Sequence, residues 1–347
     1  SRDYLIIGSQ STMSTESLIL PCSSPSGDFK VFQKRERGLE YSIDHKAGDF
    51  YIHHNKKAKN FMLSKCSDEG ETFMDNWHTV IAHRDDVLLE NIELYADRFI
   101  VEERKDGLVK FRVIENENDY YIDFPDETYT AYLTSNVDLN STKLRYGYSS
   151  LVKPSSLFEY NFTNSVTSLL KQQEIVGGYD ESVYTSKRIL IDARDGEKVP
   201  VSIVYAKELD LSDAPLLLYA YGSYGYSIDA YFSVARLSLL ERGFVFAIAH
   251  IRGGEEKGRA WYESGKLLNK LNTFNDFIDC GEALIDQGFC HPKKLSVMGG
   301  SAGGMLVGGV INMRPDLFTS AIAAVPFVDC VTTMLDDTIP LTTGEYD

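Results

Sequence analysis

The chain has 347 residues, of which 43% are hydrophobic and 25% are charged, and its formal net charge is −16. This composition is typical of a globular protein with a sizeable core, and no apolar run approaches the length of a membrane span. The negative charge argues against nucleic acid as a partner, and the length favours two domains over one.

The five cysteines are an odd number without the spacing of a disulfide framework. We therefore predict free thiols in a reducing, cytoplasmic compartment rather than disulfides. No Cys-x-x-Cys that would indicate a metal occurs. The adjacent histidines His53 and His54 are too isolated to indicate a metal. The sequence therefore predicts neither a metal site nor a bound cofactor.

The first half of the chain alternates apolar and polar residues and contains many aromatic and turn residues. The beginning of one strand recurs at Tyr4, Tyr51, Phe99 and Tyr146, in steps of 47, 48 and 47 residues. A period of about 40–50 residues with several short strands per unit is typical of β-propeller blades. An antiparallel sandwich with a coincidental spacing is the alternative.

Each unit pairs the recurring strand with a partner that follows a polar turn. The predicted partners are residues 17–20, 60–63 and 108–111. Four units would leave a propeller ring open, so we expect only the later blades of a larger propeller. The pattern loosens between residues 163 and 180, and we place a border there: residues 1–174 are blades, and residues 175–347 form a second domain.

Strands and helices alternate in the second half. The predicted strands are residues 188–191, 200–205, 215–220, 243–249, 295–298 and 322–325, and the predicted helices are residues 233–242 and 273–287 with a further helix after residue 301. This alternation indicates a parallel sheet with helices on both faces.

A short apolar run from Leu295 to Met298 ends at a glycine-rich turn, and small and apolar residues follow. The turn contains the pattern G-x-S-x-G over residues 299–303, with Ser301 at its centre. Strand, tight turn and helix form the context of a nucleophile elbow, which predicts an α/β-hydrolase domain with Ser301 as nucleophile. The Ala302 N–H would then face a developing oxyanion. A glycine-rich turn without any catalytic role is the alternative.

Longer stretches resemble the prolyl oligopeptidase family of serine peptidases, most closely its oligopeptidase B branch. The matching stretches are YGSYGYSID (221–229), RLSLLERGFVFAIAHIRGG (236–254), NTFNDFIDC (272–280), MGGSAGGM (298–305), RPDLF (314–318) and VPFVDCVTTMLDDTIPLTTGE (325–345), with EYSIDH (40–45) and RFIVEER (98–104) in the first half. The resemblance covers essentially the whole chain.

The resemblance implies an α/β-hydrolase domain and a seven-bladed propeller that admits only short peptides, with no cofactor. By position, Ser301 is the nucleophile, and Tyr221 completes the oxyanion hole with the N–H of Ala302. It also implies that Glu345 and Asp347 form an acidic pair that binds the substrate's Arg or Lys. Asp229 matches the first acid of a D-x-D pattern for a second basic residue.

Several positions depart from the family pattern. Tyr231 stands where D-x-D has its second acid, which weakens the case for a dibasic preference, and Glu255 replaces a small residue. Arg252 is interpreted as structural. The family orders its triad Ser, Asp, His, and no histidine follows Ser301. We therefore expect an internal piece of a larger enzyme that is inactive alone.

Two other functions stay open. A carboxylesterase on the same fold would need neither the acidic pair nor the propeller. A non-catalytic propeller scaffold with an inactive hydrolase domain would not present a reactive serine.

Overall fold

A computed structural model describes residues 3–11, 13–116, 118–336, 338–339 and 343–346. The chain divides into two compact units. Unit 1 comprises residues 1–104, 111–122 and 138–140, and unit 2 comprises residues 105–110, 123–137 and 141–347. The predicted border between residues 174 and 175 falls inside unit 2 and stays a prediction about domains.

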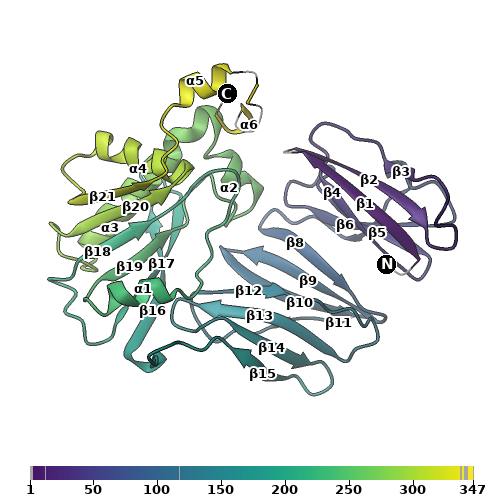
Figure 1. The fold of residues 1–347 in the computed structure, drawn as a ribbon, viewed down its shortest axis with the longest axis horizontal. Coiled ribbons are helices and arrows are strands. Elements are labelled where there is room, and N and C mark those ends of the chain that lie inside the picture. The colour runs from purple at the N-terminus through teal and green to yellow at the C-terminus, as the bar shows by residue number, and fades with distance from the viewer. Residues whose placement is uncertain (1–2, 12, 117, 337, 340–342, 347) are drawn as a thin grey trace. The chain divides into compact units, whose positions relative to one another are not determined.

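In the described residues, the first half forms one three-stranded and three four-stranded sheets (Figure 1). The sheets are, in strand order, β1 (Tyr4–Ser11), β2 (Ser14–Pro21) and β3 (Lys30–Gln33); β4 (Tyr41–Lys46), β5 (Asp49–His54), β6 (Met62–Ser67) and β7 (His78–Ile81); β11 (Asn118–Ile122), β10 (Leu108–Glu115), β9 (Arg98–Lys105) and β8 (Val87–Leu94); and β12 (Tyr129–Leu133), β13 (Lys143–Ser150), β14 (Ser156–Asn161) and β15 (Val166–Gln172). Apart from strands and loops, the described residues of these sheets contain only one short 3-10 turn, Met74–Asn76.

The recurring aromatic residues fall on equivalent strands. Tyr51, Phe99 and Tyr146 lie on β5, β9 and β13, each the second strand of its sheet by sequence. Tyr4 lies on β1. By this period, β1, β2 and β3 correspond to the second, third and fourth strands of the other sheets. The structure thus has the blade repeat that the spacing predicted.

Alternation along strands such as β5 and β10 buries one face of a blade. On β5, Phe50 and Ile52 are fully buried, while Tyr51 between them is only partly buried. Phe32 of β3 packs edge-on against Phe50, with ring centres 5.1 Å apart. Buried aromatic residues such as Phe32 and Phe50 therefore contribute to the core of unit 1.

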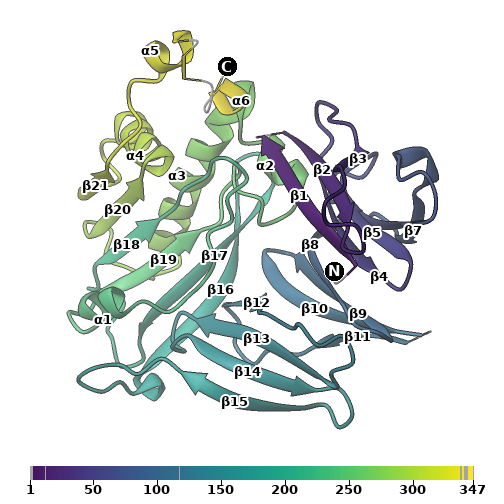
Figure 2. The same ribbon diagram turned by 45° about the vertical axis from the view of Figure 1, so that its right-hand side comes forward.

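The second half forms a six-stranded sheet (Figure 2). Its strand order is β16 (Tyr184–Asp192), β17 (Lys198–Ala206), β19 (Val245–Ala249), β18 (Leu216–Tyr219), β20 (Leu295–Gly300) and β21 (Ser320–Ala324). The pairs β16–β17 and β17–β19 are antiparallel, and the other pairs are parallel. A parallel sheet was predicted; the observed sheet is mixed, because a hairpin turn at Asp195–Gly196 reverses the chain between its first two strands.

The helices of the second half are α1 (Val234–Leu240), α2 (Arg259–Glu263), α3 (Lys270–Asp286), α4 (Ala302–Met313), α5 (Cys330–Leu335) and α6 (Thr343–Tyr346), with 3-10 turns at Glu181–Val183 and Leu267–Asn269. Helices pack on both faces of this sheet, α1 on one and α3 and α4 on the other. On β19, Val245 and Ala247 lie in the apolar cluster that includes α3 and α4. Phe246 points to the opposite face, into the cluster that includes α1.

The apolar cluster that includes α1 also explains why unit 2 extends into the first half of the chain. Leu151, directly after β13, is 2% exposed and packs in the same cluster as Leu217 of β18 and Phe246 of β19. The sheet β12–β15 is therefore joined to the mixed sheet by a shared core. No helix in the described part of the chain is long and apolar enough to cross a membrane.

Candidate active site

Ser301 occupies the turn between β20 and α4. Strand β20 ends at Gly300, helix α4 begins at Ala302, and Ser301 itself is exposed. Its backbone has φ 54° and ψ −115°, outside the regions that non-glycine residues ordinarily adopt. A strained serine at a strand–helix turn is the geometry that a nucleophile elbow requires.

Close packing holds this backbone in place. The Ser301 N–H donates to the carbonyl of Ala324 at 2.9 Å, which ties the turn to the end of β21. A Cβ on Gly299 would lie 2.1 Å from the carbonyl oxygen of Gly303, and a Cβ on Gly303 would lie 2.7 Å from that of Ala220. The glycines of the motif are therefore required because strand, helix and the end of β18 approach one another closely.

Tyr221 lies beside the elbow, two residues after the end of β18. Burial raises the pKa of the Tyr221 phenol, and a side-chain hydrogen bond with Ser301 partly offsets this rise. Ala302 is the first residue of α4, so its N–H has no acceptor within the helix. The structure thus brings the three residues of the predicted catalytic set to one place, and their roles stay a prediction.

Further tyrosines surround this point. The Tyr226 ring lies 5.8 Å from the Tyr221 ring, and the Tyr346 ring lies 6.0 Å from that of Tyr224. Phe327 packs 5.3 Å from Tyr346. Apart from Tyr221, these rings were not predicted as site residues, although the repeated tyrosines of residues 221–226 are a visible signal.

Glu345, on helix α6, is 1% exposed, and both of its carboxylate oxygens have partners. The Tyr262 hydroxyl donates to Oε2 at 2.8 Å, and the Lys270 ammonium lies 3.4 Å from Oε1. Asp347, its predicted partner in substrate binding, lies outside the described residues. The predicted role of Glu345 in binding a basic side chain is not tested by this geometry.

Lys270 is a residue that sequence reasoning missed. It begins α3, and its ammonium donates to the carbonyl of Gly222 at 2.7 Å and to the Ser223 hydroxyl at 2.6 Å. Burial lowers the pKa of Lys270, and Glu345 opposes this shift. No spacing in the sequence links residues 223, 270 and 345, so only the fold could reveal the contact.

Asp229 lies in the loop after the tyrosines and accepts a hydrogen bond from the Thr130 hydroxyl of β12 at 3.1 Å. Nearby, Tyr231 is 52% exposed, and its carbonyl accepts a hydrogen bond from Arg236 at 2.7 Å. Burial lowers the pKa of Arg236 to about 10. The Arg236 guanidinium carbon also lies 5.7 Å from the centre of the Tyr231 ring.

Arg252 has the structural contacts that the sequence suggested. Its guanidinium is bound by the fully buried Asp276, with Nη2 at 2.5 Å from Oδ1, and by Asp195 at 2.6 Å. The next residue, Gly253, accepts a hydrogen bond from the Gly225 N–H at 3.0 Å. Arg252 therefore anchors the loop that packs against the turn after Tyr221.

The two histidines of unit 2 have local partners. The His250 Nε2 lies 2.8 Å from the Ser202 hydroxyl, and the His291 Nδ1 accepts the Lys293 N–H at 3.0 Å. Across the described residues, no group of three or more His, Cys, Asp or Glu could hold a metal ion. All five cysteines are free thiols, and burial raises the pKa of Cys290 to about 11.

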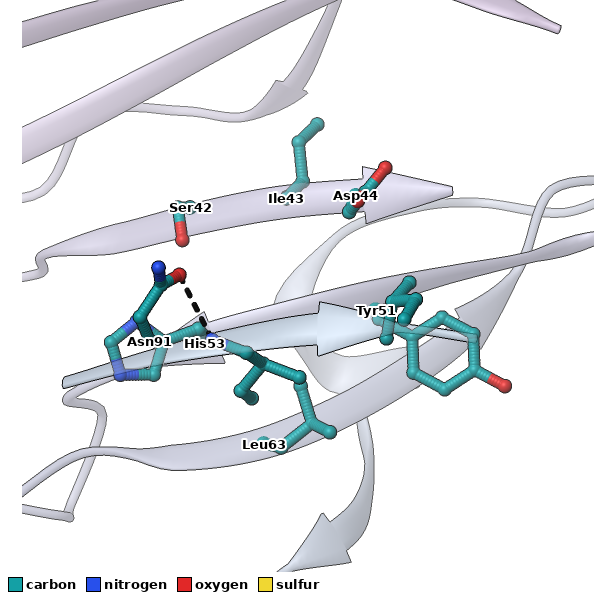
Figure 3. A pocket seen from close by; sticks show the side chains of 9 residues that line it. Ser42, Ile43, Asp44, Tyr51, His53, Leu63 and Asn91 are labelled. Carbon is teal, nitrogen blue, oxygen red and sulfur yellow. Dashed lines mark hydrogen bonds between the residues drawn. The ribbon is translucent and has the colours of Figure 1, made fainter. Parts of the chain in front are cut away.

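Unit 1 contains a hollow of about 180 Å³ that also contains a serine, an acid and a histidine (Figure 3). Ser42 and Asp44 lie on β4, and His53 lies on β5. The His53 Nε2, however, is bonded to the carbonyl of Leu89 at 2.8 Å, and its ring stacks on Phe61. Burial lowers the pKa of His53 to about 4. This group has the residue types of a triad, but the Nε2 of its imidazole is bound by a backbone carbonyl.

Comparison with known proteins identifies the family of this chain. Residues 1–173 match the family model described as prolyl oligopeptidase, N-terminal beta-propeller domain, and residues 230–347 match the model of the prolyl oligopeptidase family. The chain belongs to the prolyl oligopeptidase family. The predicted resemblance and the predicted pairing of propeller blades with an α/β-hydrolase domain are thereby confirmed.

Relatives of this family match the chain along its full length. It is 44% identical to dipeptidyl aminopeptidase BI of Pseudoxanthomonas mexicana, covering 100% of this chain and 48% of that protein. It is 37% identical to protease 2 of Moraxella lacunata, covering 100% of this chain and 50% of that protein. The chain thus spans about half the length of the curated relatives it matches.

Solved structures agree with this assignment. Oligopeptidase B from Leishmania major has a TM-score of 0.90 at 37% identity, covering 99% of this chain and 50% of that one. Oligopeptidase B from Trypanosoma brucei with covalently bound antipain, in a closed form, has a TM-score of 0.89 at 37% identity, covering 99% of this chain and 51% of that one.

Proposed function

We propose that the whole protein is a cytoplasmic serine oligopeptidase that cleaves short peptides after Arg or Lys through an acyl-enzyme on Ser301. The observation that carries the proposal is the strained, exposed Ser301 beside Tyr221 at the beginning of α4. An ordinary glycine-rich turn needs neither the strain nor the phenol. Family membership and the similarity to oligopeptidase B support this choice.

The chemistry follows from the positions of these groups. The Ser301 oxygen attacks the scissile carbonyl, and the carbonyl oxygen gains the negative charge. We propose that the Ala302 N–H and the Tyr221 hydroxyl donate to that oxygen; removing one such donor typically slows acyl transfer about 10²–10³-fold. The serine proton needs a general base, and no histidine follows Ser301 in the printed sequence. The tests therefore use the whole protein.

Selectivity for a basic side chain is proposed to come from Glu345. A buried carboxylate suits a guanidinium, which forms charge-assisted hydrogen bonds that a neutral side chain cannot form. We propose that Asp347 assists Glu345. We assign to Asp229 a weaker role in binding a neighbouring residue of the peptide, because Tyr231 replaces the second acid.

The first experiment compares substrates on the purified whole protein. An arginyl anilide should be hydrolysed faster than its norleucyl analogue and faster than a neutral aryl ester, in terms of kcat/KM. A strong preference for the ester would favour the carboxylesterase. A fluorophosphonate probe should label Ser301, as mapped by mass spectrometry, and a protein without label would favour a non-catalytic scaffold.

The relative named dipeptidyl aminopeptidase BI raises a second possibility, removal of dipeptides from a free amino terminus. Peptides with arginine as their second residue, prepared with free and with acetylated amino termini, separate the two activities. An endopeptidase should cleave both forms. Loss of cleavage on acetylation would replace the endopeptidase proposal with an aminopeptidase that uses the same serine.

A further inference from the structure

The carboxylate of Glu345 already has a cation beside it. Lys270 lies 3.4 Å from Oε1, while the Tyr262 hydroxyl donates to Oε2 at 2.8 Å. Glu345 is 1% exposed, so little solvent screens this pair. A basic side chain that binds Glu345 would therefore approach a carboxylate whose charge is partly neutralised.

The ammonium of Lys270 is fixed rather than free to swing away. An ammonium has three N–H donors, and Lys270 has three oxygen acceptors: the Gly222 carbonyl at 2.7 Å, the Ser223 hydroxyl at 2.6 Å and Glu345 Oε1. Ser223 is fully buried, and the Tyr346 ring centre lies 5.4 Å from the same nitrogen. Leaving this position would strand several buried acceptors, which is unfavourable.

We propose that Lys270 is a specificity-determining residue, the resident counter-ion of Glu345 that weakens the attraction of the site for a basic substrate side chain. The inference deepens the proposed function and rests on it, since it assumes that Glu345 faces the substrate. A fixed positive charge next to the binding carboxylate repels an incoming guanidinium. Like charges a few ångströms apart in a poorly solvated site interact strongly.

A purely structural role for Lys270 is the competing explanation. Its bonds to Gly222 and Ser223 tie α3 to the turn directly after Tyr221. If that tie were its whole contribution, removing it would displace Tyr221 and lower kcat for every substrate. A charge effect would instead act on KM, and only for substrates with a basic side chain.

The test is Lys270→Met in the whole protein, assayed with the arginyl anilide and its uncharged norleucyl analogue. The methionine keeps the length of the apolar stem and removes the charge. We expect KM for the arginyl substrate to fall roughly tenfold relative to the norleucyl substrate, with kcat changed equally for both. An equal loss of kcat on both substrates, with the KM ratio unchanged, would overturn the inference.

Lys266→Met is the matched control. The Lys266 ammonium lies over the Tyr262 ring, 4.3 Å from its centre, on the opposite side of the 3-10 turn from Lys270 in the sequence. Its loss should leave the ratio of the two KM values unchanged. If Lys266→Met changed that ratio as much as Lys270→Met, the effect would come from the general charge of the region, and the inference would be wrong.

Glu345→Gln separates the failure of this inference from the failure of the proposed function. The amide oxygen can still accept the Tyr262 hydroxyl, but the charge is gone. If the arginyl preference survives this change, Glu345 does not select basic residues and that part of the proposed function fails. If the preference disappears while Lys270→Met leaves the KM ratio unchanged, only the role of Lys270 is refuted.

A second variant guards against misfolding. Should Lys270→Met not fold, Lys270→Gln removes the charge and keeps a side-chain amide that can donate to the Gly222 carbonyl and the Ser223 hydroxyl. The same lower relative KM for the arginyl substrate is expected. An unchanged ratio in a folded Lys270→Gln protein would count against the proposal as fully as the same result for methionine.

Discussion

The elbow of unit 2 and the hollow of unit 1 contain similar residue types in different settings. In the hollow, Ser42, Asp44 and His53 lie on regular strands, and His53 is bonded to a backbone carbonyl (Figure 3). At the elbow, Ser301 has φ 54° and ψ −115°, and its side chain partly offsets the rise that burial causes in the pKa of the Tyr221 phenol. Both sites contain a serine, but only one combines strain with a directed partner.

The difference teaches that a list of residue types does not define a site. Burial lowers the pKa of His53 to about 4, against the opposing effect of its hydrogen bond to the Leu89 carbonyl. This shift reflects packing in a blade. The elbow departs from ordinary geometry at the backbone, and strain of about 1–3 kcal/mol persists only where surrounding structure enforces it. Strain that the packing enforces is the stronger sign of function.

The largest effect should come from Ser301→Ala, with Ser42→Ala as its matched control. In the whole protein, losing a catalytic serine should reduce kcat about 10⁶-fold and abolish fluorophosphonate labelling. Ser42→Ala should leave both unchanged, because nothing in the hollow is arranged for catalysis. The comparison between the two regions would be broken if Ser42→Ala lowered kcat or if Ser301→Ala kept its label.

Gly303→Ala should damage the elbow itself. A Cβ there would lie 2.7 Å from the Ala220 carbonyl oxygen and 3.3 Å from the Tyr221 Cα. Overpacking of this kind destabilises a protein by about 1–3 kcal/mol, and the displaced Tyr221 should also lower kcat. Thermal unfolding and anilide hydrolysis of the whole protein measure the two effects.

Gly308→Ala is the control on the same helix. Nothing lies within 4 Å of the position its Cβ would take, so only helix propensity changes. Alanine in a helix interior is favoured over glycine by about 1 kcal/mol, and this variant should be slightly more stable with unchanged kcat. Equal losses in the two variants would show that α4, rather than the close approach at the elbow, limits activity.

Tyr221→Phe sharpens the comparison at the level of one hydroxyl. In the proposed mechanism, the phenol beside Ser301 donates to the developing oxyanion. Its loss should lower kcat about 10²-fold while KM changes little. A change confined to KM would assign the hydroxyl to substrate binding and would remove it from the proposed oxyanion hole.

The sequence was most informative where structure is local. The elbow could be predicted because Gly299, Ser301 and Gly303 lie within five residues, and the apolar runs on either side fix their context. The blades could be predicted because the same strand recurs at a constant period. Both signals depend on neighbours in the chain, so no long-range contact had to be known.

The remaining features depend on contacts that sequence spacing does not encode. Lys270 reaches Glu345 across 75 residues, and Tyr262 reaches it across 83. The direction of β17 was also missed, because an apolar strand reads the same in a parallel and in an antiparallel sheet. The helix α3 begins at Lys270 rather than at the predicted Thr273, since an unpatterned first turn gives no apolar signal.

The smallest effect concerns the hollow, where perturbation should affect stability and not catalysis. Because the native pKa of His53 is about 4 and the ordinary value is 6.5, the unfolded chain binds a proton that the native state does not bind between these values. Its contribution to stability is therefore complete above pH 6.5 and is lost as the pH falls toward 4. Allowing for its partial exposure, the loss at pH 5 should be about 1 kcal/mol.

His53→Gln tests this in the whole protein, by comparing unfolding midpoints at pH 5 and pH 7.5. The variant should lose less stability on acidification than the unmodified protein, with anilide hydrolysis at pH 7.5 unchanged. His78→Gln, at an exposed position on β7, should reproduce the unmodified pH dependence. If His53→Gln instead lowered kcat without a change in the pH dependence of stability, the hollow would have a catalytic link, and the contrast with the elbow would no longer hold.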